Sequence, residues 1–290
     1  MAKSSVIAVL AGLLAVGCGD DDGTTTGGTG MDGGGGGAIP ASCTDDGRCV
    51  FVFETLTLPR AEGNVIDGFD LDDSGDIVCM NEDFDGDVDN TFALIGPLLA
   101  GSGRMLPIND LLSESLVNGD ALILIELEGV GGASPTLNLY AGEVPAGGVM
   151  TDAEGRILAG QTFTGTLTAS APAMIGETDV NAEGLAGFEL RVQIAEPEEA
   201  GSSLIGIEDT PIAFSFASDG SVDSGVIGGS IDLPGLLDVV FDLGFEPGSP
   251  GIQILRNFAD LDTDPEAEGC EALSVALSFT AVDAELTTGG

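Results

Sequence analysis

Apolar and polar residues alternate along several stretches of this chain, a period typical of β-strands with one buried face. The positions predicted to face a core are Phe163, Leu167, Phe188, Leu190, Val192, Ile194, Ile212, Phe214, Phe216, Leu273, Val275, Leu277 and Phe279. Further candidate strands cover 50–58, 121–128 and 136–141. Glycine, proline, asparagine and aspartate separate these runs at short intervals, as the turns of a β-sandwich or barrel require. We therefore expect a mainly β fold, a single sandwich or barrel-like domain.

Two short helices are predicted inside this domain. Asn90 can cap a helix over 91–99, and Asn109 can cap a helix over 110–117. Gly119 follows the second run and is a stop signal, because glycine readily adopts the left-handed conformation that ends helices. Both segments are expected to sit between strands.

Residues 1–17 have the layout of a bacterial lipoprotein signal. Lys3 provides a positive start, and the apolar or small residues 6–17 are too few to span a bilayer as a stable helix. They end in Leu-Ala-Val-Gly before Cys18, which resembles the lipobox read by lipoprotein signal peptidase; Ala15 departs from the commoner leucine. We expect Cys18 to carry the lipid, palmitate included, that anchors the protein to a membrane. The alternative is an ordinary secretory signal with a chance cysteine.

A flexible tether is predicted after the lipid anchor. Residues 18–41 are rich in glycine, threonine and aspartate, and such a coil has a root-mean-square reach of roughly 25 Å. Gly19 stands where aspartate is associated with retention in the inner membrane, so we expect the outer membrane, on its periplasmic or surface face. The acidic β ectodomain is predicted over 42–290, and within it 233–241 fits either a helix or a loop.

Four cysteines remain beyond the lipidation site, and an even number outside the cytoplasm indicates two disulfides. Three pairings are compatible with the sequence, and we predict Cys43–Cys49 and Cys79–Cys270. The alternative is a zinc site made of all four thiolates, although the paired C-x-x-C spacing of such sites is missing.

The acidic composition excludes several classes of function. The chain has 49 acidic residues against seven basic ones, with a formal net charge of −42. Such a surface repels nucleic-acid phosphates, which proteins bind through lysine and arginine, so we expect no nucleic-acid partner. Histidine and tryptophan are absent, which removes an imidazole base and a Ser-His-Asp triad. We expect no catalytic activity; a remote alternative is an aspartic hydrolase built on the Asp-Ser-Gly triplets at Asp73 and Asp223.

Residues 67–89, here called the Asp-rich segment, hold ten acidic residues and no basic one. The run 70–77 resembles the start of an EF-hand loop, although Asn81 replaces its bidentate glutamate. The run 83–90 resembles the calcium loops of thrombospondin type 3 and dockerin modules. The sequence therefore predicts a Ca²⁺ site, and a solvated acidic loop is the alternative. The predicted ligands are Asp70, Asp72, Ser74, Asp76, Asp83, Asp85, Asp87 and Asp89.

Several phrases of the ectodomain together resemble a group of uncharacterised acidic lipoproteins predicted in myxobacteria and similar Gram-negative bacteria. These phrases lie at 68–72, 87–90, 123–127, 155–158, 225–229 and 270–282. The resemblance implies an exported, anchored protein and supplies no activity. We expect a cell-envelope lipoprotein that acts as a calcium-stabilised structural or interaction module, with an envelope protein or polysaccharide as partner. A polysaccharide- or substrate-binding surface protein is the alternative.

Overall fold

The computed structural model describes residues 38–61, 65–71, 88–95, 108–193, 202–242, 245–261 and 270–288. The predicted signal, Cys18 and all but the end of the predicted tether lie outside these residues. The strands are β1 (Arg48–Thr57), β2 (Ile123–Glu128), β3 (Thr136–Glu143), β4 (Gln161–Ile175), β5 (Asp179–Gln193), β6 (Ser202–Phe216), β7 (Val222–Asp232) and β8 (Ala272–Thr288). The helices are α1 (Ala41–Asp46), α3 (Ile108–Asn118), α4 (Leu233–Asp242) and α5 (Pro250–Asn257).

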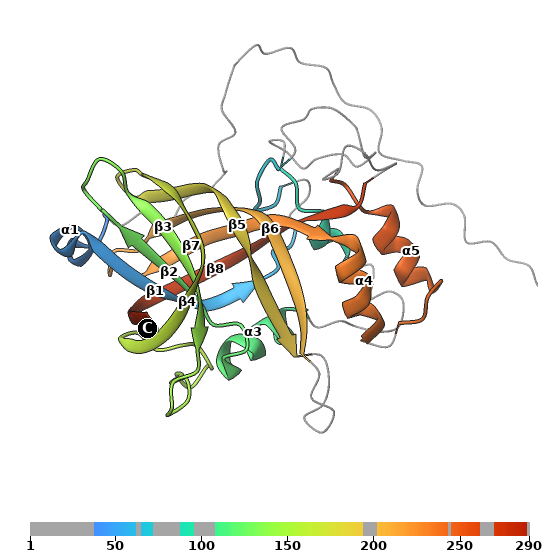
Figure 1. Ribbon diagram of the computed structural model, residues 1–290, viewed down its shortest axis with the longest axis horizontal. Coiled ribbons are helices and arrows are strands. Elements are labelled where there is room, and N and C mark those ends of the chain that lie inside the picture. Colours follow the sequence, from blue (N-terminus) through green and yellow to red (C-terminus); the bar gives the residue numbers. More distant parts are fainter. Residues whose placement is uncertain are drawn as a thin grey trace, which may run out of the picture.

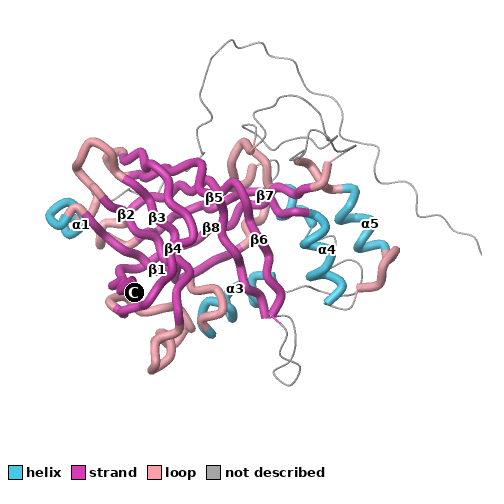
Figure 2. Tube along the Cα trace, viewed as in Figure 1, coloured by secondary structure: helices cyan, strands magenta, loops and turns pink. Residues whose placement is uncertain are grey.

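The eight strands form a closed barrel in chain order, and each neighbouring pair, including β8 with β1, is antiparallel. Figure 1 shows α4 and α5 together at one end of the barrel and α1 at the opposite end. Figure 2 shows strands in the centre of the molecule and helices at its periphery. The predicted mainly β, barrel-like architecture is therefore confirmed.

A second closure divides the interior in two. β4 and β8 also pair in parallel, from Gln161 opposite Ala284 to Gly165 opposite Thr288. Because β8, β1, β2, β3 and β4 are already neighbours, this pairing closes a smaller ring of five strands. The two faces of β1–β3 consequently bury two separate clusters. The main core includes Phe51, Phe53, Ile123, Ile125, Leu139, Phe214 and Phe279, and the small core includes Val50, Val52, Leu122, Leu124, Tyr140, Phe163 and Leu286.

A bulge at Thr168 sends β4 from one core to the other. Leu139 of β3 pairs with Ala169, whereas the next residue, Tyr140, pairs with Leu167, so Thr168 is the extra residue. An extra residue reverses which face each later side chain occupies. Phe163 accordingly lies in the small core and Ala169 in the main core. Leu167, at the point of reversal, is 52% exposed, and the prediction that it faces a core was wrong.

The main core is built around aromatic rings that need a glycine beside them. The ring of Phe279 stacks on Phe53, with centroids 4.1 Å apart and planes 8° apart. Its cross-strand partner on β7 is Gly225, and a Cβ at that position would collide with the ring of Phe279. Phe214, the other ladder neighbour of Gly225, packs edge-on against Phe279. The missing side chain thus makes room for the rings.

The first part of strand β8, residues 272–277, is buried on both faces, although its alternation predicted one polar face. Ser274 is fully buried, and the cost is offset because Thr91 N donates to its Oγ at 2.8 Å and its own N donates to Asp260 Oδ1 at 2.8 Å. The side chain of Asn90 forms hydrogen bonds with both backbone groups of Ala276, at 3.1 and 3.2 Å. The predicted side-chain cap is therefore wrong: Asn90 binds β8, while its backbone carbonyl accepts from Ala93 N. Residues 91–95 are helical as predicted, and 96–99 lie outside the described residues.

The other helix predictions need further corrections. α3 begins at Ile108, and the amide side chain of Asn109 binds both backbone groups of Leu58 instead of capping the helix. Gly119, with φ 82°, ends α3 as predicted. The ambiguous segment 233–241 is helical within α4, and α5 was not predicted. α1 begins at Ala41, inside the predicted tether, so the folded domain starts earlier than residue 42.

Candidate functional site

A cavity of about 740 Å³ opens beside the β4 bulge. β4 pairs with β5 only between Ala173–Ile175 and Val180–Ala182, because its first half turns away toward β8. The wall between β3 and β5 is therefore interrupted, and the turn after α3 lies at the same opening. The second closure of the barrel thus creates the cavity.

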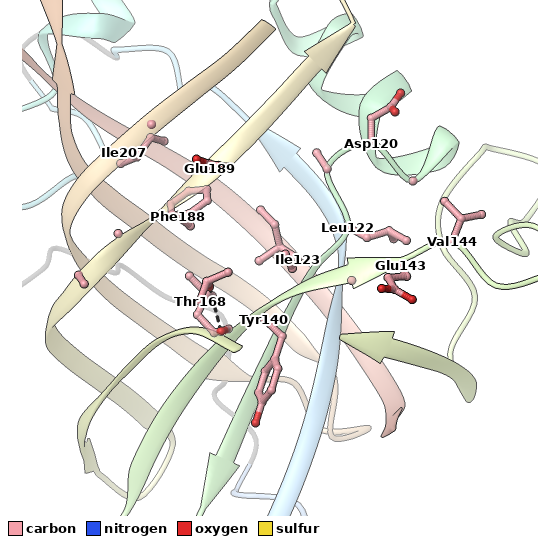
Figure 3. Close-up of a pocket in the computed structure, with 18 of the residues that line it drawn as sticks. Asp120, Leu122, Ile123, Tyr140, Glu143, Val144, Thr168, Phe188, Glu189 and Ile207 are labelled. Carbon is pink, nitrogen blue, oxygen red and sulfur yellow. Dashed lines mark hydrogen bonds between the residues drawn. The ribbon is translucent and has the colours of Figure 1, made fainter. Parts of the chain in front are cut away.

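The inner walls of the cavity are apolar. Phe188 and Ile207 come from β5 and β6 on one side, and Ile123, the first residue of β2, comes from the other (Figure 3). All three side chains are buried; Leu122 also borders the cavity, but its side chain lies in the small core. Thr168 lies between the two walls, and its Oγ1 donates to the carbonyl of Leu139 at 3.0 Å, the dashed line in Figure 3. The cavity thus offers a preformed surface against which the apolar part of a ligand can pack.

Four carboxylates line the same cavity: Asp120, Glu143, Glu189 and Glu208. The three glutamates are exposed and Asp120 is half-buried. Lysine and arginine are missing from the described lining, and none of the four acids takes part in an ion pair within the described part of the chain. The cavity therefore combines apolar walls with negative charge that no described cation neutralises.

A separate polar network closes one end of the small core. Glu126 is buried, yet it accepts hydrogen bonds from Arg48 Nε, from Asn138 Nδ2 at 3.0 Å and from Tyr140 OH at 2.5 Å. Ser170 Oγ donates to Asn138 Oδ1 at 2.6 Å. The ring of Tyr140 points away from the cavity, although its residue lines the wall (Figure 3).

Electrostatics show that this network is internally satisfied. Burial raises the pKa of Glu126, but the hydrogen bonds from Tyr140, Arg48 and Asn138 outweigh it, so the pKa lies below its ordinary value. Burial, and then the hydrogen bond to Glu126, raise the pKa of Tyr140 to about 12. A carboxylate and a phenol locked in these states stabilise the fold and are poorly suited to exchange protons with a substrate near pH 7.

The predicted calcium ligands fall largely outside the described residues: Asp72, Ser74, Asp76, Asp83, Asp85 and Asp87. Of the other two, Asp70 is exposed, and Asp89 is buried with its Oδ2 accepting from Leu71 N at 2.7 Å. Among described residues no group of three or more acidic, cysteine or histidine side chains could hold a metal ion. Calcium binding by the Asp-rich segment stays a prediction.

The cysteines follow the disulfide prediction where they are described. Cys43 and Cys49 form a disulfide that ties α1 to β1. Cys270 is also disulfide-bonded, and its predicted partner, Cys79, lies outside the described residues, so that pairing stays a prediction. Because two of the four thiols are joined to each other, the alternative of a four-thiolate zinc site is wrong.

The aspartic-hydrolase hypothesis stays a prediction. Asp223 is exposed on β7, and Asp73 lies outside the described residues. In the described part of the chain no helix is both long and apolar enough to cross a membrane.

The cavity itself was not predicted from the sequence. Its four acids, from Asp120 to Glu208, come from one turn and three strands, and only the pairing of β5 with β6 and the departure of β4 bring them together. Comparison with protein families, with curated proteins and with solved structures finds no match to this chain.

Proposed function

We propose that this protein is a non-catalytic binding module, held at the cell envelope by a lipid on Cys18, whose cavity takes a small molecule with an apolar body. The observation that carries the proposal is the cavity of about 740 Å³ with apolar walls beside the β4 bulge. Pockets of this size are where proteins bury small ligands, and this one presents polar and apolar surface in similar amounts. The absence of histidine from the sequence supports a binding role over an acid–base catalytic one.

Ligand binding is tested with a neutral probe, 1-naphthylmethanol, titrated calorimetrically into the exported chain as purified from cells, with empty lipid nanodiscs as the blank. For a probe of this size we expect a dissociation constant on the order of 1 mM or tighter. Absence of binding would contradict the proposal.

A matched pair of variants locates the site. Thr168→Trp places an indole between the two walls and is expected to weaken binding at least about tenfold, since it fills the space that the probe needs. Thr166→Trp introduces the same ring on the same strand at an exposed position outside the cavity lining, and it is expected to leave binding unchanged. Equal effects of the two variants would place the probe elsewhere.

Anchoring is tested separately. Mass spectrometry of the native protein is expected to find a mature chain that begins at an acylated Cys18. An uncleaved chain or a free thiol at that residue would refute the envelope anchor without bearing on the cavity.

A further inference from the structure

We infer that the ligand of the cavity is a small cationic amphiphile, an organic amine or quaternary ammonium with an apolar body. This inference rests on the proposed function, because it assigns a chemical class to the ligand of the same cavity. Apolar walls and acidic groups occur together there, with the apolar side chains inside and the carboxylates at the opening.

The strand geometry separates the two kinds of surface. Glu189 follows Phe188 on β5, and Glu208 follows Ile207 on β6. Adjacent residues of a strand point to opposite faces, so the apolar side chains turn into the barrel while the carboxylates stay at the outer edge of the opening. The exposure pattern agrees, since both apolar residues are buried and both glutamates are exposed. A bound molecule would therefore meet hydrocarbon inside and carboxylate outside.

A glycine leaves space beside one of these carboxylates, Glu189. Glu189 pairs across the ladder with Gly206, and Glu208 pairs with Gly187. Glu189 therefore has no cross-strand side chain to partner it, whereas Glu208 lies opposite Ser230 on its other side, and an ideal Cβ on Gly206 would have no heavy atom within 4 Å. The space beside Glu189 is open to a ligand head group.

Charge then decides which head group fits. Glu143 and Asp120 complete the acidic lining from the other side of the opening. Arg48 pairs with Glu126 and Arg156 pairs with Asp152, so neither of these two arginines neutralises the acids of the cavity. A ligand cation would gain attraction from several carboxylates at once, whereas an anion would be repelled. The general acidity of the chain would draw cations anywhere, and what distinguishes this site is the apolar cavity directly beneath the charges.

The test compares three ligands that share one hydrocarbon body: 1-naphthylmethylamine, 1-naphthylmethanol and 1-naphthylacetate. In titrations of the exported chain at pH 7 and low salt, we expect the amine to bind about fivefold tighter than the alcohol and the acetate to bind more weakly than either. Added 0.5 M NaCl is expected to remove most of the advantage of the amine, because it screens exposed charges.

Variants in which glutamates are replaced by glutamine complete the test. Glu189→Gln and Glu143→Gln together are expected to bring the amine down to the affinity of the alcohol while leaving the alcohol unchanged. Glu183→Gln removes an equally exposed carboxylate from β5 outside the cavity lining, and it is expected to leave all three affinities unchanged.

The outcomes separate the two proposals. If the alcohol binds as tightly as the amine, the cationic ligand is refuted and the binding module stands. If none of the three binds, both fail. If the amine binds at many equivalent sites, or if Thr168→Trp does not weaken it, its attraction belongs to the acidic surface and the inference is overturned.

Discussion

Tyr140 gives an optical test of the small core, because it is the only tyrosine in a chain without tryptophan. Its hydroxyl donates to Glu126 Oε2 at 2.5 Å, and its side chain is 7% exposed. Burial and then the carboxylate raise its pKa to about 12. Ultraviolet absorbance of tyrosinate therefore reports one buried hydroxyl and nothing else.

The size of the effect follows from the pKa. At pH 11 a phenol with a pKa of about 12 is roughly 9% ionised, whereas an ordinary tyrosine with a pKa of about 10 is roughly 91% ionised. The fold favours the neutral phenol, so this contribution to stability is complete below about pH 10 and is lost as the pH rises through about 12. The difference of about two between the pKa of Tyr140 and that of an ordinary tyrosine corresponds to about 3 kcal/mol of stability in total.

The assay is a pH titration of absorbance with far-ultraviolet circular dichroism recorded at each pH, so that only the folded protein is scored. Glu126→Gln is expected to lower the midpoint yet leave it above about 10, because burial still acts on the phenol. Glu128→Gln, an exposed neighbour on β2, is expected to move it much less. The reasoning fails if Tyr140 is more than half ionised near pH 10 while the dichroism is still native.

Three further predictions concern packing, the disulfide and calcium. Gly225→Ala is expected to destabilise the protein by about 1–3 kcal/mol in urea unfolding because the new methyl meets the ring of Phe279, whereas Gly206→Ala, with open space at its Cβ, is expected to be near neutral; equal effects would show that the ring can move aside. Replacing both Cys43 and Cys49 by alanine is expected to lower the free energy of unfolding by about 2 kcal/mol, the loop-entropy value for so short a loop, and an unchanged urea midpoint would contradict it. Calcium titrated into the protein is expected to give a heat of binding with a dissociation constant on the order of 1 mM or tighter, and neutralising the Asp-rich segment with Asp-to-Asn changes is expected to abolish it; no heat at millimolar Ca²⁺ would end the calcium hypothesis.

The strands were predictable because their alternation matches how a sheet buries one face. Ile212, Phe214 and Phe216 are buried as predicted, and so are Phe188 and Leu190. Strand β7 was missed because its Gly-Val-Ile-Gly-Gly stretch lacks alternation, and its glycines are placed where neighbouring rings and backbone need room. Single-sequence patterns do not show that need, since the rings arrive from strands far away in the chain.

The cavity and the bulge that opens it could not be read from the sequence. Phe163 and Ala169 have the same parity in β4, yet they serve different cores because Thr168 is an extra residue opposite β3. Nothing in a Thr-Leu-Thr run marks a bulge, so Leu167 was predicted to be buried. The position of a bulge depends on the partner strand, and the opening depends on β4 leaving β5 for β8.

One sequence signal does report the divided interior, once its physical meaning is recognised. Antiparallel strands that face solvent on one side alternate, whereas strands covered on both sides are apolar throughout. The runs Val50–Phe53 and 121–125 are continuous apolar stretches among alternating strands, and they belong to the wall that the two cores share. Glu126 interrupts the second run at the end of the small ring, where three donors from neighbouring strands offset the cost of burying its carboxylate. A charged residue can therefore be buried in this shared wall only where neighbouring strands supply enough hydrogen-bond donors, and the position of Glu126 meets that condition.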